Sequence, residues 1–198
     1  MAVKRGTEIP TIDVVLVTYK PSGSKDEIAM DTASKIAVTP QTETTDAVKL
    51  IIKGVLKAQK PQKVTITGNT IVLTDNVFTP ELVKALQGGV IKWWTSAEKT
   101  TEGTEPTEFG ISSYTPPVAG STEQIPAGTL CAYSAQYNAA GLIVQYEKIE
   151  YPNCQGTPIA LSSEDDVFRA PEYTINSMPN TDEPPYKINY VKTLPSVS

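Results

Sequence analysis

The 198-residue sequence contains no histidine, two cysteines and only short apolar runs, such as Leu50–Ile52. The lack of histidine excludes His-based triads, imidazole proton shuttles and His metal ligands. Two cysteines cannot alone supply the four ligands of a structural zinc site. The apolar runs are too short for a transmembrane helix, and no apolar stretch follows Met1–Arg5 as it would in a secretory signal. We therefore expect no catalytic residue, no metal, no cofactor and no membrane partner.

What is present favours strands and turns. Threonine is abundant, and the 16 prolines outnumber the 12 glycines. Threonine is enriched in strands, and proline is confined to turns and sheet edges. At this length we expect one domain over residues 1–198. The predicted fold is mainly β, a β-sandwich or partial barrel with one short flanking α-helix and long loops.

Charge is divided unevenly along the chain. Residues 1–98 hold 12 basic and 10 acidic residues, a net charge of +2, and residues 99–198 hold 5 and 12, a net charge of −7. An acidic half is a poor partner for nucleic-acid phosphates. The charge therefore argues against a nucleic-acid-binding module.

The first half of the chain contains several strand signals. The β-branched stretch 11–20 lies between two prolines and predicts a strand. Residues 21–34 are small and polar and predict a long loop. Residues 46–58 alternate apolar and other residues, which predicts one strand whose second face carries Lys49, Lys53 and Lys57 toward solvent or a partner.

A hairpin and a helix are predicted next. Residues 64–74 predict a hairpin turning at Gly68-Asn69. A short helix is predicted to start at Pro80 after an N-cap at Thr79, and to end at Gly88-Gly89. A strand over 90–95 and a long polar loop over 96–108 follow.

The second half predicts another hairpin and an edge strand. Residues 130–151 predict a hairpin turning at 138–141, with Tyr137 opposite Leu142 and Tyr133 opposite Tyr146. Shorter signals predict a strand near 109–114, a helical turn within 161–169, and a last strand over 186–192 after two prolines, at a sheet edge.

The residues that could carry chemistry favour structural readings. Because no export signal is present, Cys131 and Cys154 are expected to be reduced thiols rather than a disulfide. The cluster 164–166 lacks the ligand spacing of a calcium loop. Glu147 and Glu150 are expected on opposite strand faces, which argues against a glycosidase pair. We therefore expect that the protein is not an enzyme.

Trp93 and Trp94 are adjacent in a predicted strand, so their side chains should point to opposite faces. We expect one in the core and the other exposed. An exposed tryptophan suits a protein interface or a sugar site. The interface is favoured, and a carbohydrate-binding β-sandwich or adhesion module remains the alternative.

The order of segments between residues 31 and 89 resembles that of the major tail tube proteins of tailed bacteriophages: a long polar loop, a long strand, a hairpin and one flanking helix. The resemblance implies hexameric rings that stack into a hollow tube in the virion tail, assembled in the host cytoplasm. The implied partners are other copies of the chain, a tape-measure protein, and tail terminator and baseplate proteins. DNA would pass through the lumen during ejection without specific binding.

The resemblance directs attention to contacts between subunits and between rings. The loops 21–34 and 96–108 are expected to order on a neighbouring subunit. Contractile tails, non-contractile tails and tail-derived bacteriocins all remain open. The candidate contact residues are Ser22, Lys25, Asp26, Glu27, Lys49, Lys53, Lys57 and Trp94.

Overall fold

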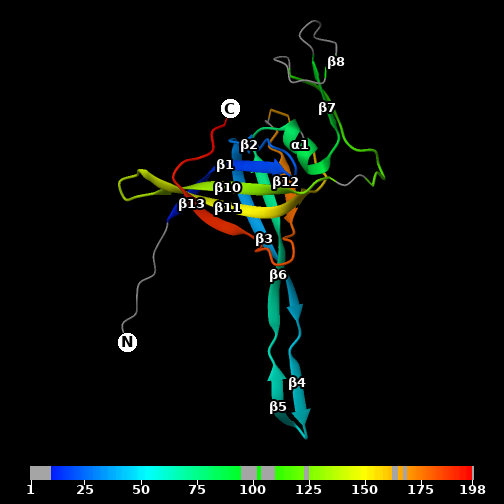
Figure 1. Ribbon diagram of the computed structural model, residues 1–198, viewed down its shortest axis with the longest axis vertical. Coiled ribbons are helices and arrows are strands. Elements are labelled where there is room, and N and C mark those ends of the chain that lie inside the picture. The colour runs from blue at the N-terminus through cyan, green and yellow to red at the C-terminus, as the bar shows by residue number, and fades with distance from the viewer. Residues whose placement is uncertain are drawn as a thin grey trace.

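The computed structural model describes residues 10–94, 102–103, 110–122, 125–161, 165–166 and 169–197. Antiparallel strands dominate, with one short helix, so the predicted mainly-β class is confirmed (Figure 1). The elements in chain order are β1 (Thr11–Pro21), β2 (Ile28–Met30), β3 (Ala33–Thr45), β4 (Val48–Ile52), β5 (Val55–Lys60), β6 (Lys63–Asp75), α1 (Pro80–Gln87), β7 (Val90–Trp94), β8 (Glu102–Gly103), β9 (Ile111–Thr115), β10 (Gly128–Tyr137), β11 (Ile143–Gly156), β12 (Glu172–Ser177) and β13 (Lys187–Val191).

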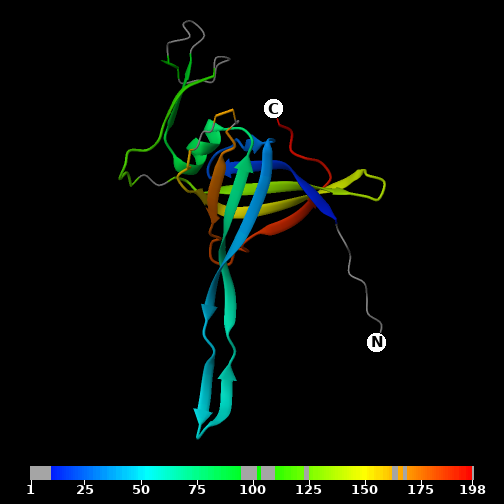
Figure 2. The same ribbon diagram turned by 180° about the vertical axis from the view of Figure 1, so that it is seen from behind.

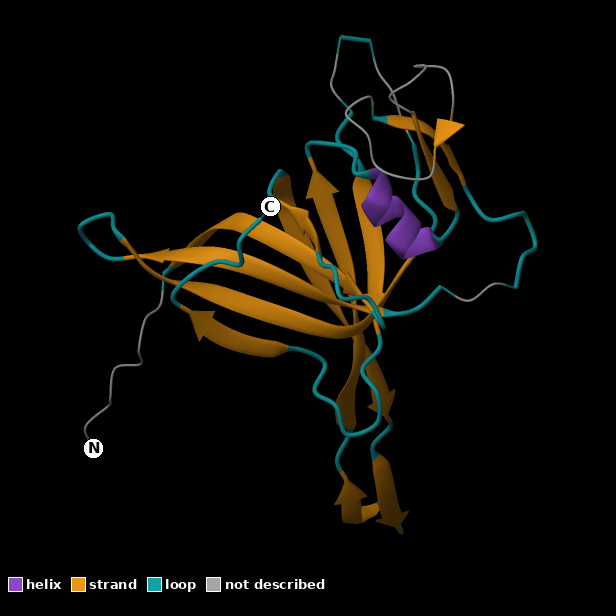
Figure 3. Ribbon diagram, turned by 45° about the horizontal axis from the view of Figure 1, so that its top comes forward, coloured by secondary structure: helices purple, strands orange, loops and turns teal. Residues whose placement is uncertain are grey.

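The body of the molecule is a strongly bent sheet. Its strands run in the order β2-β1-β10-β11-β12-β6-β3, and β13 pairs with β11. Residues 146–150 of β11 pair with β13, whereas residues 154–156 pair with β12. The strands β1, β10 and β11 therefore cross the strands β12, β6 and β3 as two layers (Figure 3). The result is an open, partial barrel.

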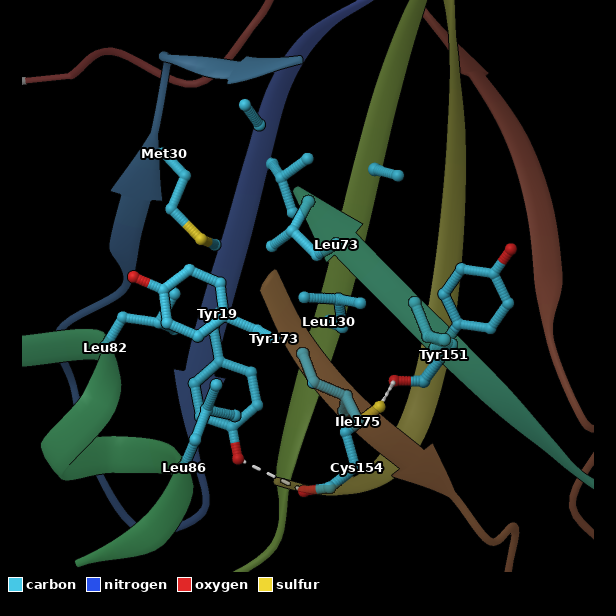
Figure 4. Close-up of a cluster of buried hydrophobic side chains, with 14 of the residues drawn as sticks. Tyr19, Met30, Leu73, Leu82, Leu86, Leu130, Tyr151, Cys154, Tyr173 and Ile175 are labelled. Carbon is cyan, nitrogen blue, oxygen red and sulfur yellow. Dashed lines mark hydrogen bonds between the residues drawn. The ribbon is translucent and has the colours of Figure 1, made fainter. Parts of the chain in front are cut away.

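The main core lies between these two layers, and α1 covers one end (Figure 4). A second, smaller cluster lies on the other face of β1 and β10, where Leu16, Cys131 and Tyr133 pack against Val191 and Leu194. Both faces of these strands are thus partly covered. The fully buried side chains of the main core include Val17, Tyr19, Met30, Ile71, Leu73, Leu82, Leu130 and Ile175.

The helix forms where the sequence predicts it. Thr79 occupies the N-cap position, although its side chain makes no capping hydrogen bond, and Gly88 ends the helix at φ 80°. The apolar face is buried against the sheet through Leu82, Val83 and Leu86. An eight-residue helix is marginal alone, so this packing stabilises it.

The predicted hairpin over 64–74 is wrong, because these residues form the middle of one continuous strand, β6. Gly68 is needed for close approach rather than for a turn: a Cβ there would lie 2.5 Å from the carbonyl oxygen of Ser177. The side chain of Asn69 is buried, and its Nδ2 donates a 2.9 Å hydrogen bond to the carbonyl of Pro185. Strand and turn signals overlap at Gly-Asn, and tertiary packing decides between them.

The predicted single strand over 46–58 is also wrong. The chain reverses at Lys53-Gly54, and β4 and β5 form a hairpin. Both turn residues have positive φ, 50° and 78°, as a two-residue type I′ turn requires. The three predicted lysines therefore do not share one strand face. Lys49 lies on β4, Lys53 in the turn, and Lys57 at the bulge of β5.

The predicted loop over 21–34 is shorter than expected. Residues 28–30 form β2 and residues from 33 onward form β3, so the connection spans 22–27. Met30 and Ala33 belong to the core, with exposures of 1% and 7%. Because β2 and the start of β3 belong to the folded body, only the connection over 22–27 can act as a loop that orders on a partner.

The second hairpin, β10–β11, is confirmed, but the predicted register is off by two residues. Ala135 lies opposite Tyr146, and Tyr133 lies opposite Lys148. The side chain of Asn138 accepts hydrogen bonds from the backbone of Ala140 and Leu142, which builds a wider turn than expected.

The remaining strand predictions are confirmed where the structure describes them. β7 and β9 match the predictions over 90–95 and 109–114, and β13 is an edge strand beside β11. Of the predicted loop 96–108, residues 102–103 form β8 and pair with β7. Its other residues lie outside the described part of the chain, as does most of the predicted helical turn over 161–169; within that span, Asp165 and Asp166 form an exposed turn.

Candidate assembly surface

Residues 42–67, called the arm below, project from the body as a two-stranded ribbon (Figures 1 and 2). The end of β3 pairs with the start of β6, from Thr42 opposite Ile66 to Thr45 opposite Lys63, and β4–β5 extends the ribbon. Among the described residues these strand segments pair only with each other. Both long edges of the arm therefore present unpaired backbone groups, which are able to pair with another chain.

The arm is unusually apolar for a solvent-exposed ribbon. Single exposed apolar residues are ordinary, but contiguous apolar surface on a soluble protein marks an interaction site. Its large apolar side chains have exposures of 44% to 64%, and they are Val48, Leu50, Ile51, Ile52, Val55, Leu56, Val64 and Ile66.

Apolar side chains occupy both faces of the tip. The pair Ile52 and Val55 lies on one face, and the next pair, Ile51 and Leu56, lies on the other. A two-stranded ribbon without a core is marginal in water. Covering these side chains would contribute about 25 cal/mol per Å² of apolar surface removed from water. The arm therefore has the character of a segment that is stabilised by another chain.

The arm is also the basic part of the chain. Residues 42–67 hold five lysines and two acidic residues, a net charge of +3. The whole chain carries −5, so the residues outside the arm carry −8. The arm therefore accounts for the positive sign of the first half, since residues 1–98 outside the arm carry −1.

The candidate contact residues fall into two separate groups. Lys49, Lys53 and Lys57 lie on the arm. The other group lies toward the opposite end of the molecule, where Ser22, Lys25, Asp26 and Glu27 form the connection between β1 and β2, and Trp94 ends β7 (Figure 1). The fold does not bring the two groups together within one chain.

The two tryptophans do not divide into one core and one exposed residue. Both are half-buried, which corrects the prediction from strand alternation. Trp93 lies opposite Gly103 of β8, and Trp94 opposite Glu102. The backbone of Trp94 donates a 3.0 Å hydrogen bond to the carbonyl of Gly110.

Trp93 lines a groove of about 560 Å³ beside the helix. The groove lies among the β1–β2 connection, α1 and β7. Its volume falls within the range of sites that bind small molecules or a few side chains. The described residues that line it are Pro21, Ser24, Asp26, Ile28, Glu81, Lys84, Ala85, Gly88, Gly89, Ile91, Trp93, Ile125 and Pro126.

The two cysteines are free and buried, as expected for reduced thiols. Burial raises the pKa of Cys154 to about 11 and also raises the pKa of Cys131. The thiol of Cys154 donates to the carbonyl of Tyr151 at 3.3 Å. Because the thiolate is the reactive form, these environments suit packing rather than nucleophilic chemistry.

The strand carboxylates make local structural contacts. Glu147 accepts a 3.0 Å hydrogen bond from Thr11, and Glu150 forms a 3.0 Å ion pair with Lys148. Within the described ranges no group of three or more Cys, Asp and Glu residues is placed to hold a metal ion. The one helix that the structure describes is too short to cross a membrane.

Sequence reasoning found the lysines of the arm but missed the arm itself. A usable signal was present: Lys53-Gly54 lies between two runs rich in Val, Leu and Ile, and glycine after a polar residue is typical of a type I′ turn. The alternation of apolar residues across residues 46–58 hid this turn.

Comparison with known proteins gives matches among solved structures only. No family model matches the chain, and no curated protein matches its sequence. The chain is similar to a solved chain of the anti-feeding prophage baseplate, determined by cryo-electron microscopy with 6-fold symmetry. The alignment covers 96% of this chain and 98% of that one, at 7% identity and a TM-score of 0.35. This TM-score is below that expected of two chains sharing a fold.

Proposed function

We propose that the protein is a structural subunit that assembles with copies of itself through the arm, as a tail tube subunit of a phage or phage-derived particle. The observation that carries the proposal is the arm: a ribbon with two open edges and exposed apolar side chains on both faces. Such a ribbon gains stability when a neighbouring chain pairs with its edge or covers its face.

The tube architecture is proposed from the order of segments. A long strand, β3, leads into the arm, and a second long strand, β6, returns to the body and leads to the single helix. The resemblance of the sequence to tail tube proteins predicts one long strand followed by a hairpin and the helix, whereas in the structure the hairpin lies between two long strands that precede the helix. In the proposed assembly, subunits form rings, expected to be hexameric, which stack around a lumen that conducts DNA.

The proposed partners follow from that architecture. The first partner is another copy of the chain, and the tape-measure, tail terminator and baseplate proteins would meet the tube at its lumen and ends. The particle would assemble in the host cytoplasm. The acidic charge of −8 outside the arm would disfavour binding of DNA phosphates to the body.

The experiment compares an apolar-to-acidic change on the arm with a matched change on the body. Leu50 is 53% exposed and Met178, just after β12, is 54% exposed. Leu50→Asp should abolish assembly, because a carboxylate would have to be buried at the contact, and Met178→Asp should leave assembly intact. Sedimentation velocity at micromolar and higher protein concentrations measures the assembly state of both variants. Assembly of Leu50→Asp at wild-type concentrations would contradict the proposal.

A sugar-binding function is the second candidate, because Trp93 shares its groove with Ser24, Asp26 and Glu81. An aromatic face beside polar groups suits a carbohydrate ring. A glycan array separates the two functions: binding that is lost in Trp93→Ala would favour the sugar site. The absence of any array signal, with wild-type assembly present, would favour the structural subunit.

A further inference from the structure

We propose that the tip of the arm, residues 48–58, of one copy docks into the Trp93 groove of a second copy and so joins subunits head to tail. The Trp93 groove is the groove defined above by its lining residues. This inference rests on the proposed function, because it names the surface that the arm meets.

The two surfaces lie at opposite ends of the molecule. Figures 1 and 2 show the arm extending to one end of the longest axis, while α1 and β7 lie toward the other end. An arm in this position points away from the groove of its own chain. The arm can therefore reach a groove only on another copy.

The groove offers an apolar interior to an apolar tip. Ile28, Ile91 and Trp93 line it from β2 and β7, and Ala85 lines it from α1. Ile28 and Trp93 are half-buried, so part of each side chain is available for contact. The tip presents Ile52 and Val55 as a cross-strand pair beside the turn, with exposures of 48% and 54%. A volume of about 560 Å³ can accommodate a few such side chains.

The charges of the two surfaces are complementary. Asp26 and Glu81 lie at the groove together with Lys84, a net charge of −1. The tip holds Lys49, Lys53 and Lys57 and no acidic residue, a net charge of +3. Among the described residues, the carboxylates of Asp26 and Glu81 form no ion pair, and neither do the tip lysines. An incoming lysine would therefore find a carboxylate that is not already paired.

A contact of this kind propagates. Because the arm and the groove are different surfaces, each subunit can offer its arm to one neighbour and its groove to another. Since the two surfaces lie at opposite ends of the longest axis, repetition extends the assembly along that axis. The arm–groove contact therefore suits the joining of successive layers of a stack.

The test is charge-reversal complementation between two variants of the full chain. The arm variant carries Lys53→Glu and Lys57→Glu, and the groove variant carries Asp26→Lys and Glu81→Lys. Each variant alone places like charges together at every arm–groove contact. We expect each of these two variants, taken alone, to assemble only at a protein concentration at least about tenfold above that of the wild type. In an equimolar mixture, a stack in which the two variants alternate has opposite charges at every arm–groove contact, and it should assemble near the wild-type concentration.

Matched controls and a second groove variant keep the result interpretable. Lys35→Glu and Glu172→Lys reverse exposed charges on β3 and β12 outside both surfaces and should assemble as the wild type does. Asp26→Lys alone avoids any effect of Glu81 on the helix, because Asp26 is an exposed residue of the connection. Thermal unfolding confirms that each variant folds.

The outcomes separate this inference from the proposed function. Restored assembly in the mixture supports the arm–groove contact. Normal assembly of the groove variant, with the arm variant defective, overturns the contact while the arm remains the assembly element. Two defective variants whose mixture does not assemble also overturn the contact. A wild-type chain that never assembles contradicts the proposed function itself.

Discussion

The hydroxyl of Tyr19, on β1, donates a 3.1 Å hydrogen bond to the carbonyl oxygen of Cys154, on β11. Strand β10 lies between these two strands, so the tyrosine side chain crosses it. The crossing occurs at Gly128, where a Cβ would lie 2.7 Å from the tyrosine hydroxyl oxygen and 2.6 Å from the carbonyl oxygen of Lys20. This contact fastens three strands together at the end of the core nearest α1 (Figure 4).

We expect Gly128→Ala to lower the free energy of unfolding by about 1–3 kcal/mol, because the added methyl group overpacks this crossing. Tyr19→Phe should cost about 1 kcal/mol, since it removes the hydrogen bond and keeps the ring. Urea unfolding of both variants measures the difference. A Gly128→Ala protein as stable as the wild type would show that the crossing is not tightly packed.

The same truncation should destabilise the core strongly and the arm hardly at all. Leu73 is fully buried, whereas Leu50 is 53% exposed. Leu73→Ala should cost about 2–5 kcal/mol of stability through a lost contact and a cavity. Leu50→Ala should change the stability of the isolated subunit by less than about 0.5 kcal/mol. Both values come from denaturant unfolding under conditions that keep the chain monomeric, and an equal loss in both variants would mean that the arm packs on the body.

The two thiols should be inert in the folded protein. Cys154 is fully buried and Cys131 is 7% exposed, and the pKa of each thiol is raised by burial. At pH 8, iodoacetamide should therefore label both cysteines slowly in the native chain and readily in urea. Mass spectrometry of the alkylated protein counts the labels. Native labelling of Cys154 at the urea rate would contradict its burial.

The subunit should lose stability at alkaline pH. Burial raises the pKa of Cys154 from 9.0 to about 11, and the pKa of both Tyr19 and Tyr151 from 10.0 to about 12. Between each pair of values the unfolded chain has released a proton that the folded chain retains. The stabilisation is therefore complete below pH 9 and decreases as pH rises through 11 and 12. Thermal unfolding from pH 8 to pH 12 should show a falling Tm, and a constant Tm would contradict these environments.

Local patterns predicted part of the fold. The helix at Pro80 has a strong start, an apolar face and a glycine stop, and these local signals agree with its packing. The edge strand β13 follows two prolines, and β7 and β9 stand out as short β-rich segments. In these places local chemistry and tertiary structure favour the same conformation.

Tertiary contacts decided the segments where the prediction failed. Gly68-Asn69 has the composition of a turn, but the close approach of Ser177 and the burial of Asn69 keep the chain extended. Lys53-Gly54 has a comparable turn signal, and there no neighbouring chain opposes the reversal, since nothing lies within 4 Å of a Cβ at Gly54. The arm and the residues that line the groove are far apart in the sequence, so only the folded chain shows that they lie toward opposite ends of the molecule (Figure 1).

The most direct test of the central claim is negative-stain electron microscopy of the wild-type chain beside a chain that lacks the arm. In the second chain, an Asn-Gly turn replaces residues 42–67 and joins Gln41 to Gly68, which lie opposite each other in the sheet. Both chains are imaged at micromolar and higher concentrations over a range of salt. We expect rings or stacked tubes from the wild type and folded monomers from the armless chain. Monomers from the wild type under every condition, or tubes from the armless chain, would contradict assembly through the arm.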